Sequence, residues 1–168
     1  MSRESFGDRL HGEVERKRSC LVVGLDPVLE SLPRAVLGAL GGGSSASAGY
    51  TARAAAALGL FCRGVIDAVK DAAVAVKPNS AFFERFGPAG LQALVEACRY
   101  ARRSGLLVIL DVKRGDIGHT AEAYAAAYLG ETPDTPGPHV DAVTVNPLLG
   151  TESMKPFLSL CAEHGKGL

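Results

Sequence analysis

The chain has 168 residues, of which 47% are hydrophobic and 21% charged, a composition typical of one globular domain and not of a disordered segment. Lysine plus arginine and aspartate plus glutamate both number 18, so the sequence predicts no broad basic surface for nucleic acid or an anionic membrane. The first twenty residues lack the apolar core of a secretion signal, and no later segment approaches the roughly 18 apolar residues of a membrane span. We therefore expect a cytoplasmic protein.

Strand-like and helix-like segments alternate along the chain, after a first expected helix at Ser5–Lys17. Each strand-like segment is nearly continuous in apolar residues, which is typical of a parallel strand covered on both faces. This alternation predicts right-handed βαβ crossovers and an α/β fold with a parallel sheet. The predicted strands are Cys20–Leu25, Ala72–Lys77, Leu106–Asp111 and Asp141–Asn146, and the predicted helices after them are Thr51–Asp71, Gly87–Gly105, Ile117–Leu129 and Thr151–Gly165.

Two segments are predicted to be loops that do not divide the chain into domains. Gly38–Gly49 is rich in small residues, but it lacks the GK[ST] ending and the preceding strand of a phosphate-binding loop. Gly130–His139 is rich in proline. Only four β/α units precede Leu168, whereas a closed (β/α)8 barrel has eight, so the units predict either part of a barrel or a compact open sheet.

The four cysteines lie far apart, without a CxxC pair or a histidine at metal-ligand spacing. The cysteines therefore predict no structural zinc site, and reduced, mostly buried thiols suit a cytoplasmic protein. The cysteines are Cys20, Cys62, Cys98 and Cys161.

Every predicted strand finishes on a polar or charged residue. One such residue is simply the point where a strand leaves the core, but four in succession indicate a site, because catalytic groups of parallel α/β proteins lie at the carboxyl ends of strands. The strand-ending residues are Asp26, Lys77, Asp111 and Asn146.

The third of these strand ends carries the densest charge. Asp111 and Lys113 are two residues apart on an extended segment, so their side chains should leave on the same face. Asp116 follows a glycine turn, and Thr120 should lie one helical turn further on. The same spacing also fits a salt-bridge cluster that caps the next helix, or a magnesium site formed by Asp111 and Asp116.

The segment Val108–Thr120, VILDVKRGDIGHT, resembles the motif of orotidine 5′-phosphate decarboxylases, which is DxKxxD followed by isoleucine, a small residue, any residue and threonine. The segments GLDP, VKPNSAFFERFG and AVTVNPLLGTES also resemble the long bacterial subgroup of that family. The resemblance runs from near residue 5 to the last residue. It implies a cofactor-free decarboxylation of orotidine 5′-monophosphate to UMP and carbon dioxide, the last step of de novo pyrimidine synthesis, in a homodimeric TIM (β/α)8 barrel.

The resemblance also implies roles for individual residues. Lys77, Asp111, Lys113 and Asp116 match the catalytic array of alternating charges, in which Lys113 is the proton donor and Asp116 reaches into the partner's site. The substrate-binding residues that it implies are Asp26 and Lys77 at the ribose, Thr120 at the ribose of the neighbouring subunit, and Ile117 and Asn146.

On this interpretation residues 1–168 are the N-terminal half of a single barrel domain. The family's phosphate-binding loops follow strands seven and eight, and the spacing of Arg85 and Arg114 assigns neither to phosphate. We therefore expect near-background turnover from the isolated chain, whose half-barrel would have two unpaired sheet edges.

Two alternatives come from other classes. The chain could be a non-catalytic half-barrel that binds nucleotide or assembles with a second half. It could also be a magnesium-dependent phosphosugar decarboxylase or aldolase, since 3-keto-L-gulonate 6-phosphate decarboxylase and hexulose phosphate synthase share DxKxxD.

Overall fold

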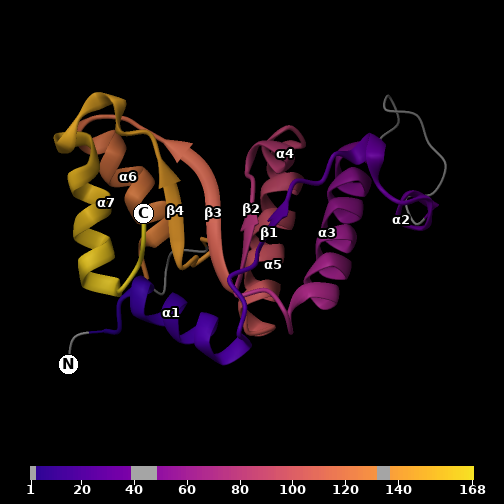
Figure 1. Cartoon of the computed structure of the whole chain (residues 1–168). Helices are drawn as coiled ribbons and strands as arrows, with labels where there is room; N and C mark the ends of the chain where they lie inside the picture. The colour runs from indigo at the N-terminus through magenta and orange to yellow at the C-terminus, as the bar shows by residue number, and fades with distance from the viewer. Residues whose placement is uncertain (1–2, 39–48, 132–136) are drawn as a thin grey trace.

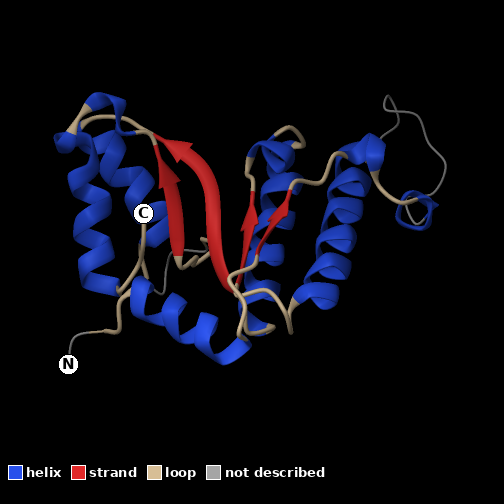
Figure 2. Cartoon of the chain, viewed as in Figure 1, coloured by secondary structure: helices blue, strands red, loops and turns tan. Residues whose placement is uncertain are grey.

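The computed structural model describes residues 3–38, 49–131 and 137–168. Within them, parallel strands form one sheet in the order β1-β2-β3-β4, with helices between successive strands (Figures 1 and 2). The strands are β1 (Val22–Leu25), β2 (Ala75–Pro78), β3 (Leu107–Arg114) and β4 (Ala142–Val145). The helices are α1 (Phe6–Lys17), η1 (Leu29–Ser31), α2 (Arg34–Gly38), α3 (Tyr50–Val69), α4 (Ala81–Glu84), α5 (Gly87–Arg103), α6 (Gly118–Leu129), η2 (Pro147–Leu149) and α7 (Thr151–His164).

The two faces of the sheet are covered differently. Figure 1 shows α3 and α5 beside β1 and β2, α6 and α7 beside β4, and α1 across the lower ends of the strands. The main core lies under the flanking helices, with fully buried residues such as Leu58, Ile66 and Leu110. A smaller cluster of sheet residues, Ala75 and Leu107 among them, packs against apolar side chains of α1. The helix α1 therefore closes the amino end of the sheet and leaves its carboxyl end free.

The predicted alternation of strands and longer helices is confirmed, but the short helices η1, α2, α4 and η2 were not predicted, and one strand differs in length. The third strand does not end at Asp111 but continues to Arg114, because pairing with β4 resumes there, at Arg114 with Val145. Three residues of β3 lie opposite the single residue Thr144 of β4, which is a bulge. Asp111, Lys113 and Arg114 are therefore part of a strand at the carboxyl end of the sheet and not of a loop that follows it.

The expectation of two unpaired sheet edges was wrong at β4. Gly167 bridges to Ala142 in parallel, with hydrogen bonds from the amide of Val143 to the Gly167 carbonyl (3.1 Å) and from the amide of Gly167 to the Asp141 carbonyl (3.0 Å). The neighbouring Lys166 side chain is 3% exposed, so the last residues are fixed in place. Lys166 and Gly167 therefore cover part of the free edge of β4, where a further parallel strand would pair.

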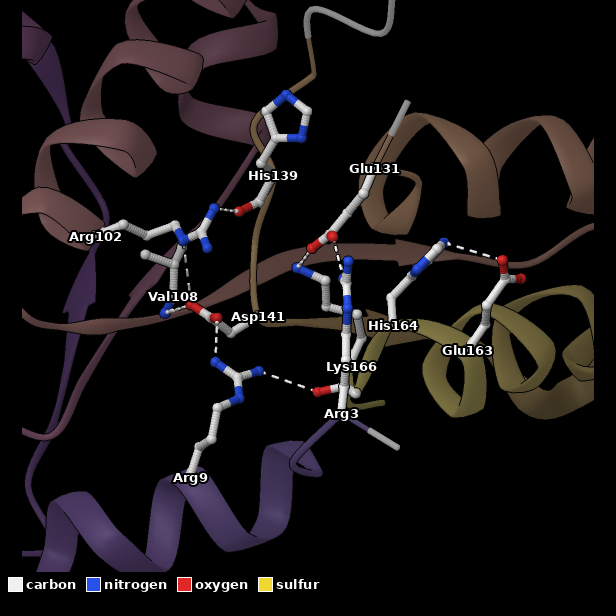
Figure 3. Close-up of polar contacts among 11 residues, drawn as sticks. Arg3, Arg9, Arg102, Val108, Glu131, His139, Asp141, Glu163, His164 and Lys166 are labelled. Carbon is white, nitrogen blue, oxygen red and sulfur yellow. Dashed lines mark hydrogen bonds and ion pairs between the residues drawn. The ribbon is translucent and has the colours of Figure 1, made fainter. Parts of the chain in front are cut away.

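Asp141 organises a polar cluster at the amino end of the sheet (Figure 3). The residue is 2% exposed, and its carboxylate accepts hydrogen bonds from Nη1 of Arg9 (2.6 Å) and from the amide of Val108 (2.9 Å). Nε of Arg102 lies 3.9 Å from Oδ2, the carboxylate oxygen that also accepts from Val108. This cluster joins α1, β3, α5 and the start of β4.

The remaining predictions concern thiols, loops and membrane spans. Cys62 and Cys98 are buried as expected, and burial raises the pKa of each to about 12, but Cys20 is exposed and Cys161 is half-buried. The loop predictions fall largely outside the described residues, in 39–48 and 132–136. None of the helices in the described ranges combines the length and apolarity that crossing a bilayer demands.

Candidate active site

The alternation of side chains along β3 brings a charge onto the concave face of the sheet. Leu107 and Ile109 belong to the cluster that packs against α1, and Asp111 is the next residue with the same orientation. On β2 the same alternation relates Ala75 to Lys77. Carboxylate and ammonium groups therefore occupy the first positions beyond the apolar part of this face, at the carboxyl end of the strands.

Asp111 is the centre of the site. It is 6% exposed, and its Oδ2 accepts a hydrogen bond from Nζ of Lys77 at 2.9 Å. Its Oδ1 accepts one from Nζ of Lys113 at 2.6 Å and one from the hydroxyl of Thr144 at 2.7 Å. Burial alone would raise the pKa of Asp111, but the hydrogen bonds from Lys113, Lys77 and Thr144 outweigh it and hold the pKa well below its ordinary range. The carboxylate is therefore ionised at any physiological pH.

Asp111, Lys77 and Lys113 form a charged trio, and Lys113 is its most accessible member. Its side chain is 67% exposed, whereas that of Lys77 is 36% exposed. Its backbone has a φ of 46°, the left-handed region that costs a residue with a side chain about 1 to 2 kcal/mol. The predicted proximity of Asp111 and Lys113 is confirmed. The bulge and the left-handed backbone, which the sequence did not predict, direct the ammonium back onto the carboxylate.

Asp116 does not belong to the charged trio of its own chain. Its Oδ1 accepts a hydrogen bond from the amide of Ile117 at 2.8 Å, one residue before α6 begins at Gly118. Ile117 is 65% exposed and Thr120 is also exposed, in the first turn of α6. Together the three residues form an accessible surface beside the trio.

The other two predicted site residues lie at the same edge of the sheet. Asp26 is exposed, and its Oδ2 lies 3.2 Å from the point that a Cβ of Gly24 would occupy. Gly24 pairs with Lys77, and its absent side chain leaves room for the Asp26 carboxylate over the face of β1. Asn146 is exposed, and its side chain accepts a hydrogen bond from the amide of Leu148 at 3.0 Å.

The two arginines that the sequence left unassigned have partners in the structure. Nη2 of Arg114 donates to Glu84 at 2.7 Å and to the hydroxyl of Tyr128 at 3.1 Å, and its guanidinium lies 5.2 Å from the ring centre of Tyr124. Arg85, in turn, donates to Glu30 at 2.9 Å and stacks on Phe86. Arg114 thus connects the end of β3, next to Lys113, to α4 and α6.

Sequence analysis missed Thr144. The signal was available, because Thr144 is two residues before Asn146 on the same predicted strand and therefore faces the same side. A threonine within a strand is otherwise unremarkable, since β-branched residues are common there.

A sheet of parallel β/α units in chain order, with charged residues at the carboxyl ends of the strands, is typical of the class of β/α-barrel proteins. Within that class, a family model described as "Orotidine 5'-phosphate decarboxylase / HUMPS family" matches residues 47–168. The chain belongs to this family.

Individual relatives agree with this membership. An orotidine 5′-phosphate decarboxylase of Rhodopirellula baltica is 43% identical over 165 residues, which are 98% of this chain and 53% of that protein. A crystal structure of a Streptomyces avermitilis protein, described as a candidate orotidine 5′-phosphate decarboxylase, superposes with a TM-score of 0.76 at 39% identity and covers 100% of this chain and 53% of that one. The structure of Leishmania donovani OMP decarboxylase gives a TM-score of 0.67 at 35% identity, with coverage of 92% and 49%. The chain therefore spans about half the length of its relatives and has the fold of about half a TIM barrel.

Proposed function

We propose that this chain carries the catalytic array of an orotidine 5′-monophosphate decarboxylase, and that residues 1–168 are the N-terminal half of one barrel domain. The observation that carries the proposal is the buried carboxylate of Asp111 held between the ammonium groups of Lys77 and Lys113. Family membership and the 43% identity to the Rhodopirellula baltica enzyme support the same substrate.

The reaction requires stabilisation of a carbanion without a cofactor. When the bond between C6 of the pyrimidine and its carboxylate breaks, carbon dioxide leaves and the electron pair stays on C6 in the ring plane. A fixed ammonium near C6 attracts this charge and then gives its proton to the carbon. Lys113 suits this role because an ammonium can release a proton, whereas a guanidinium effectively cannot. Its side chain is also the most exposed of the trio.

Asp111 has two roles in this mechanism. It keeps Lys113 charged and directs its Nζ, since a nearby opposite charge favours the ionised form. It also repels the substrate carboxylate, by roughly 4 kcal/mol for two charges about 4 Å apart at an effective dielectric constant of about 20. Enzymes remove about 8 to 23 kcal/mol from a barrier, so attraction between Lys113 and the carbanion must contribute more than this repulsion.

The remaining predicted site residues fit the substrate at the open edge of the sheet. Asp26, Lys77 and Asn146 would bind the ribose and base from within the chain. No cofactor has a part in this chemistry. The cytoplasmic location expected from the sequence stays a prediction.

We infer that the working form is a homodimer. Large apolar side chains are exposed beside the site, Ile117 at 65%, Leu148 at 85% and Leu149 at 54%. A second copy covering this surface would bring its Asp116 and Thr120 to the site.

Sedimentation of wild type and Leu148→Glu tests the homodimer, because a glutamate charge in the apolar surface should dissociate it. A wild-type chain that stays monomeric at high concentration would contradict it.

The function is tested with the chain alone and with a chimera in which residues 1–168 are joined to the segment that follows the matched half of the Rhodopirellula baltica relative. We expect turnover of orotidine 5′-monophosphate, followed by ultraviolet absorbance, from the chimera but only near background from the chain alone. Turnover should disappear in Lys113→Ala. A folded chimera without turnover would refute the proposal, and so would turnover that survives Lys113→Ala.

A chelator separates the proposal from the magnesium-dependent alternative. Both oxygens of Asp111 already accept hydrogen bonds, Oδ1 from Lys113 and Thr144 and Oδ2 from Lys77, which leaves the carboxylate poorly suited to a divalent ion. We expect turnover by the chimera to be unchanged in excess EDTA. Loss of turnover that added magnesium restores would favour a phosphosugar lyase of the same family.

A further inference from the structure

One hydroxyl group occupies the centre of the bulge between β3 and β4. Oγ1 of Thr144 donates a hydrogen bond to Oδ1 of Asp111 at 2.7 Å. The same oxygen accepts hydrogen bonds from the amides of Val112 at 3.1 Å and Lys113 at 3.0 Å. A threonine hydroxyl has one donor and two acceptor sites, so its full capacity is used at this point.

The hydroxyl replaces the strand partner that the bulge removes. Regular pairing holds at Leu110 with Val143 and resumes at Arg114 with Val145, so only Thr144 faces the three residues between them. The amides of Val112 and Lys113 use the side-chain oxygen of Thr144 in place of a backbone carbonyl. A backbone N–H left without a partner in a half-buried site is costly, so these two hydrogen bonds favour the bulged conformation.

The bulge in turn sets the geometry of the charged trio. It places Lys113 in the left-handed region, at a φ of 46°, with its Nζ 2.6 Å from Oδ1 of Asp111. This is the oxygen that also accepts from Thr144. A single side chain on β4 therefore contacts both the carboxylate and the backbone that carries the ammonium.

We propose that Thr144 is a positioning residue of the site, whose hydroxyl stabilises the bulge at Lys113 and orients the carboxylate of Asp111 toward the Lys113 ammonium. The kinetic consequence rests on the proposed function, in which Lys113 donates the proton. The structural consequence does not, and it can be measured without substrate. Threonine also suits the role because branching at Cβ restricts its side-chain rotation.

The structural test uses the 168-residue chain and hydrogen exchange at individual amides, observed by NMR. Thr144→Val keeps the shape of the side chain and removes the hydroxyl, whereas Thr144→Ser keeps the hydroxyl. Thr51→Val makes the same chemical change at an exposed position of α3 and is the matched control. We expect exchange at Val112 and Lys113 to become at least about tenfold faster in Thr144→Val only.

The carboxyl carbon of Asp111 provides a second readout. Its titration midpoint should move to higher pH in Thr144→Val, because the hydrogen bond from Thr144 is one of the contacts that lower this pKa.

Thr144→Ala replaces Thr144→Val if the second methyl prevents folding. Unchanged exchange in both hydroxyl-free variants would overturn the proposal, and so would equally fast exchange in Thr144→Ser.

The kinetic test uses the chimera defined above. We expect Thr144→Val to lower kcat about 10- to 100-fold with little change in KM, as a displaced catalytic group does. Thr144→Ser should restore kcat. Because kcat is taken per folded molecule, a mere loss of folded protein does not count toward the expected change.

The two tests separate the possible failures. If exchange changes as expected but no form of the protein turns over orotidine 5′-monophosphate, the proposed function fails and the structural role of Thr144 stands. If Lys113-dependent turnover is found but Thr144→Val leaves kcat unchanged, the positioning role fails and the proposed function stands.

Discussion

The two ends of the sheet each hold a buried aspartate between two cations, and they differ in what those cations can do. At the amino end, Asp141 is 2% exposed and faces Arg9 and Arg102. At the carboxyl end, Asp111 is 6% exposed and faces Lys77 and Lys113. Arginine holds its proton permanently and presents a rigid fork of donors, whereas lysine presents a mobile ammonium that can give its proton away. The amino-end pair can therefore only fasten elements together, and the carboxyl-end pair can also react.

The exposure of the cations sharpens this contrast. The side chain of Arg9 is 27% exposed and connects α1 to β4 with additional support from the Gly165 carbonyl, 3.1 Å away. The side chain of Lys113 is 67% exposed and its backbone is strained. In β/α barrels the carboxyl ends of strands carry chemistry and the amino ends stability, and the exposure of the Lys113 ammonium follows that division. The two ends should therefore respond to substitution in opposite ways.

The largest expected effect is on turnover, at the carboxyl end. Lys113→Ala should lower turnover by the chimera about 1,000-fold or more, because in the proposed mechanism Lys113 is both the proton donor and the charge that attracts the carbanion. The unfolding free energy should change by no more than about 1 kcal/mol, since the pair is exposed on the lysine side. Ultraviolet assay and urea unfolding measure the two quantities. Lys70→Ala, at an exposed pair with Asp67, is the control for both.

The next effect is on stability, at the amino end. Asp141→Asn should lower the unfolding free energy by about 3 kcal/mol, because it discharges a buried group that faces two guanidinium groups. Urea unfolding of the 168-residue chain measures this, with Asp67→Asn as the exposed control. Turnover per folded molecule of the chimera should stay within about twofold. A turnover loss as large as that of Lys113→Ala would remove the distinction between the two ends.

A smaller loss of stability is expected directly beneath the site. Arg114→Met should cost about 1 to 2 kcal/mol, because it breaks the contacts with Glu84 and Tyr128 that connect β3 to α4 and α6. Arg85→Met is the matched control, since Arg85 is 48% exposed, and it should cost no more than about 0.5 kcal/mol. Equal losses in urea unfolding would mean that Arg114 does not hold the carboxyl end in place.

The smallest expected effect depends on pH and concerns Glu131, near the amino end. Burial raises the pKa of Glu131, but contacts with Lys166 and Arg3 lower it to about 2. A carboxyl whose pKa is lower when folded stabilises the protein above its unfolded value of 4.5 and loses this contribution as pH falls toward 2.

The difference in unfolding free energy between wild type and Glu131→Gln should therefore be constant above about pH 5.5 and shrink below 4.5. Screening limits it to about 1 kcal/mol. Urea unfolding at several pH values measures it, and a difference that grows with acidity would contradict the assignment.

Much of the fold was predictable because it depends on local pattern. Apolar runs gave the strands to within three residues at each end, and helical patterns gave α1, α3, α5, α6 and α7 but not the short helices η1, α2, α4 and η2. The end of β3 was missed by three residues, because Lys113 and Arg114 look like the exit from a strand. What extends the strand is a hydroxyl group from β4, which lies more than thirty positions further along the chain. The pairing of Gly167 with β4 was equally invisible, since neither partner carries a side-chain signal.

The sequence by itself determined the parallel β/α order and the charged residues at the strand ends, because hydrophobic period and residue type are properties of neighbouring positions. Only the tertiary structure decided which charges meet. It brought Lys77, Asp111, Lys113 and Thr144 from three strands into one set of contacts, and it left Asp116 outside them within the chain. Such contacts depend on strand register and on a bulge between β3 and β4, and register is set by pairing between segments that are distant in sequence.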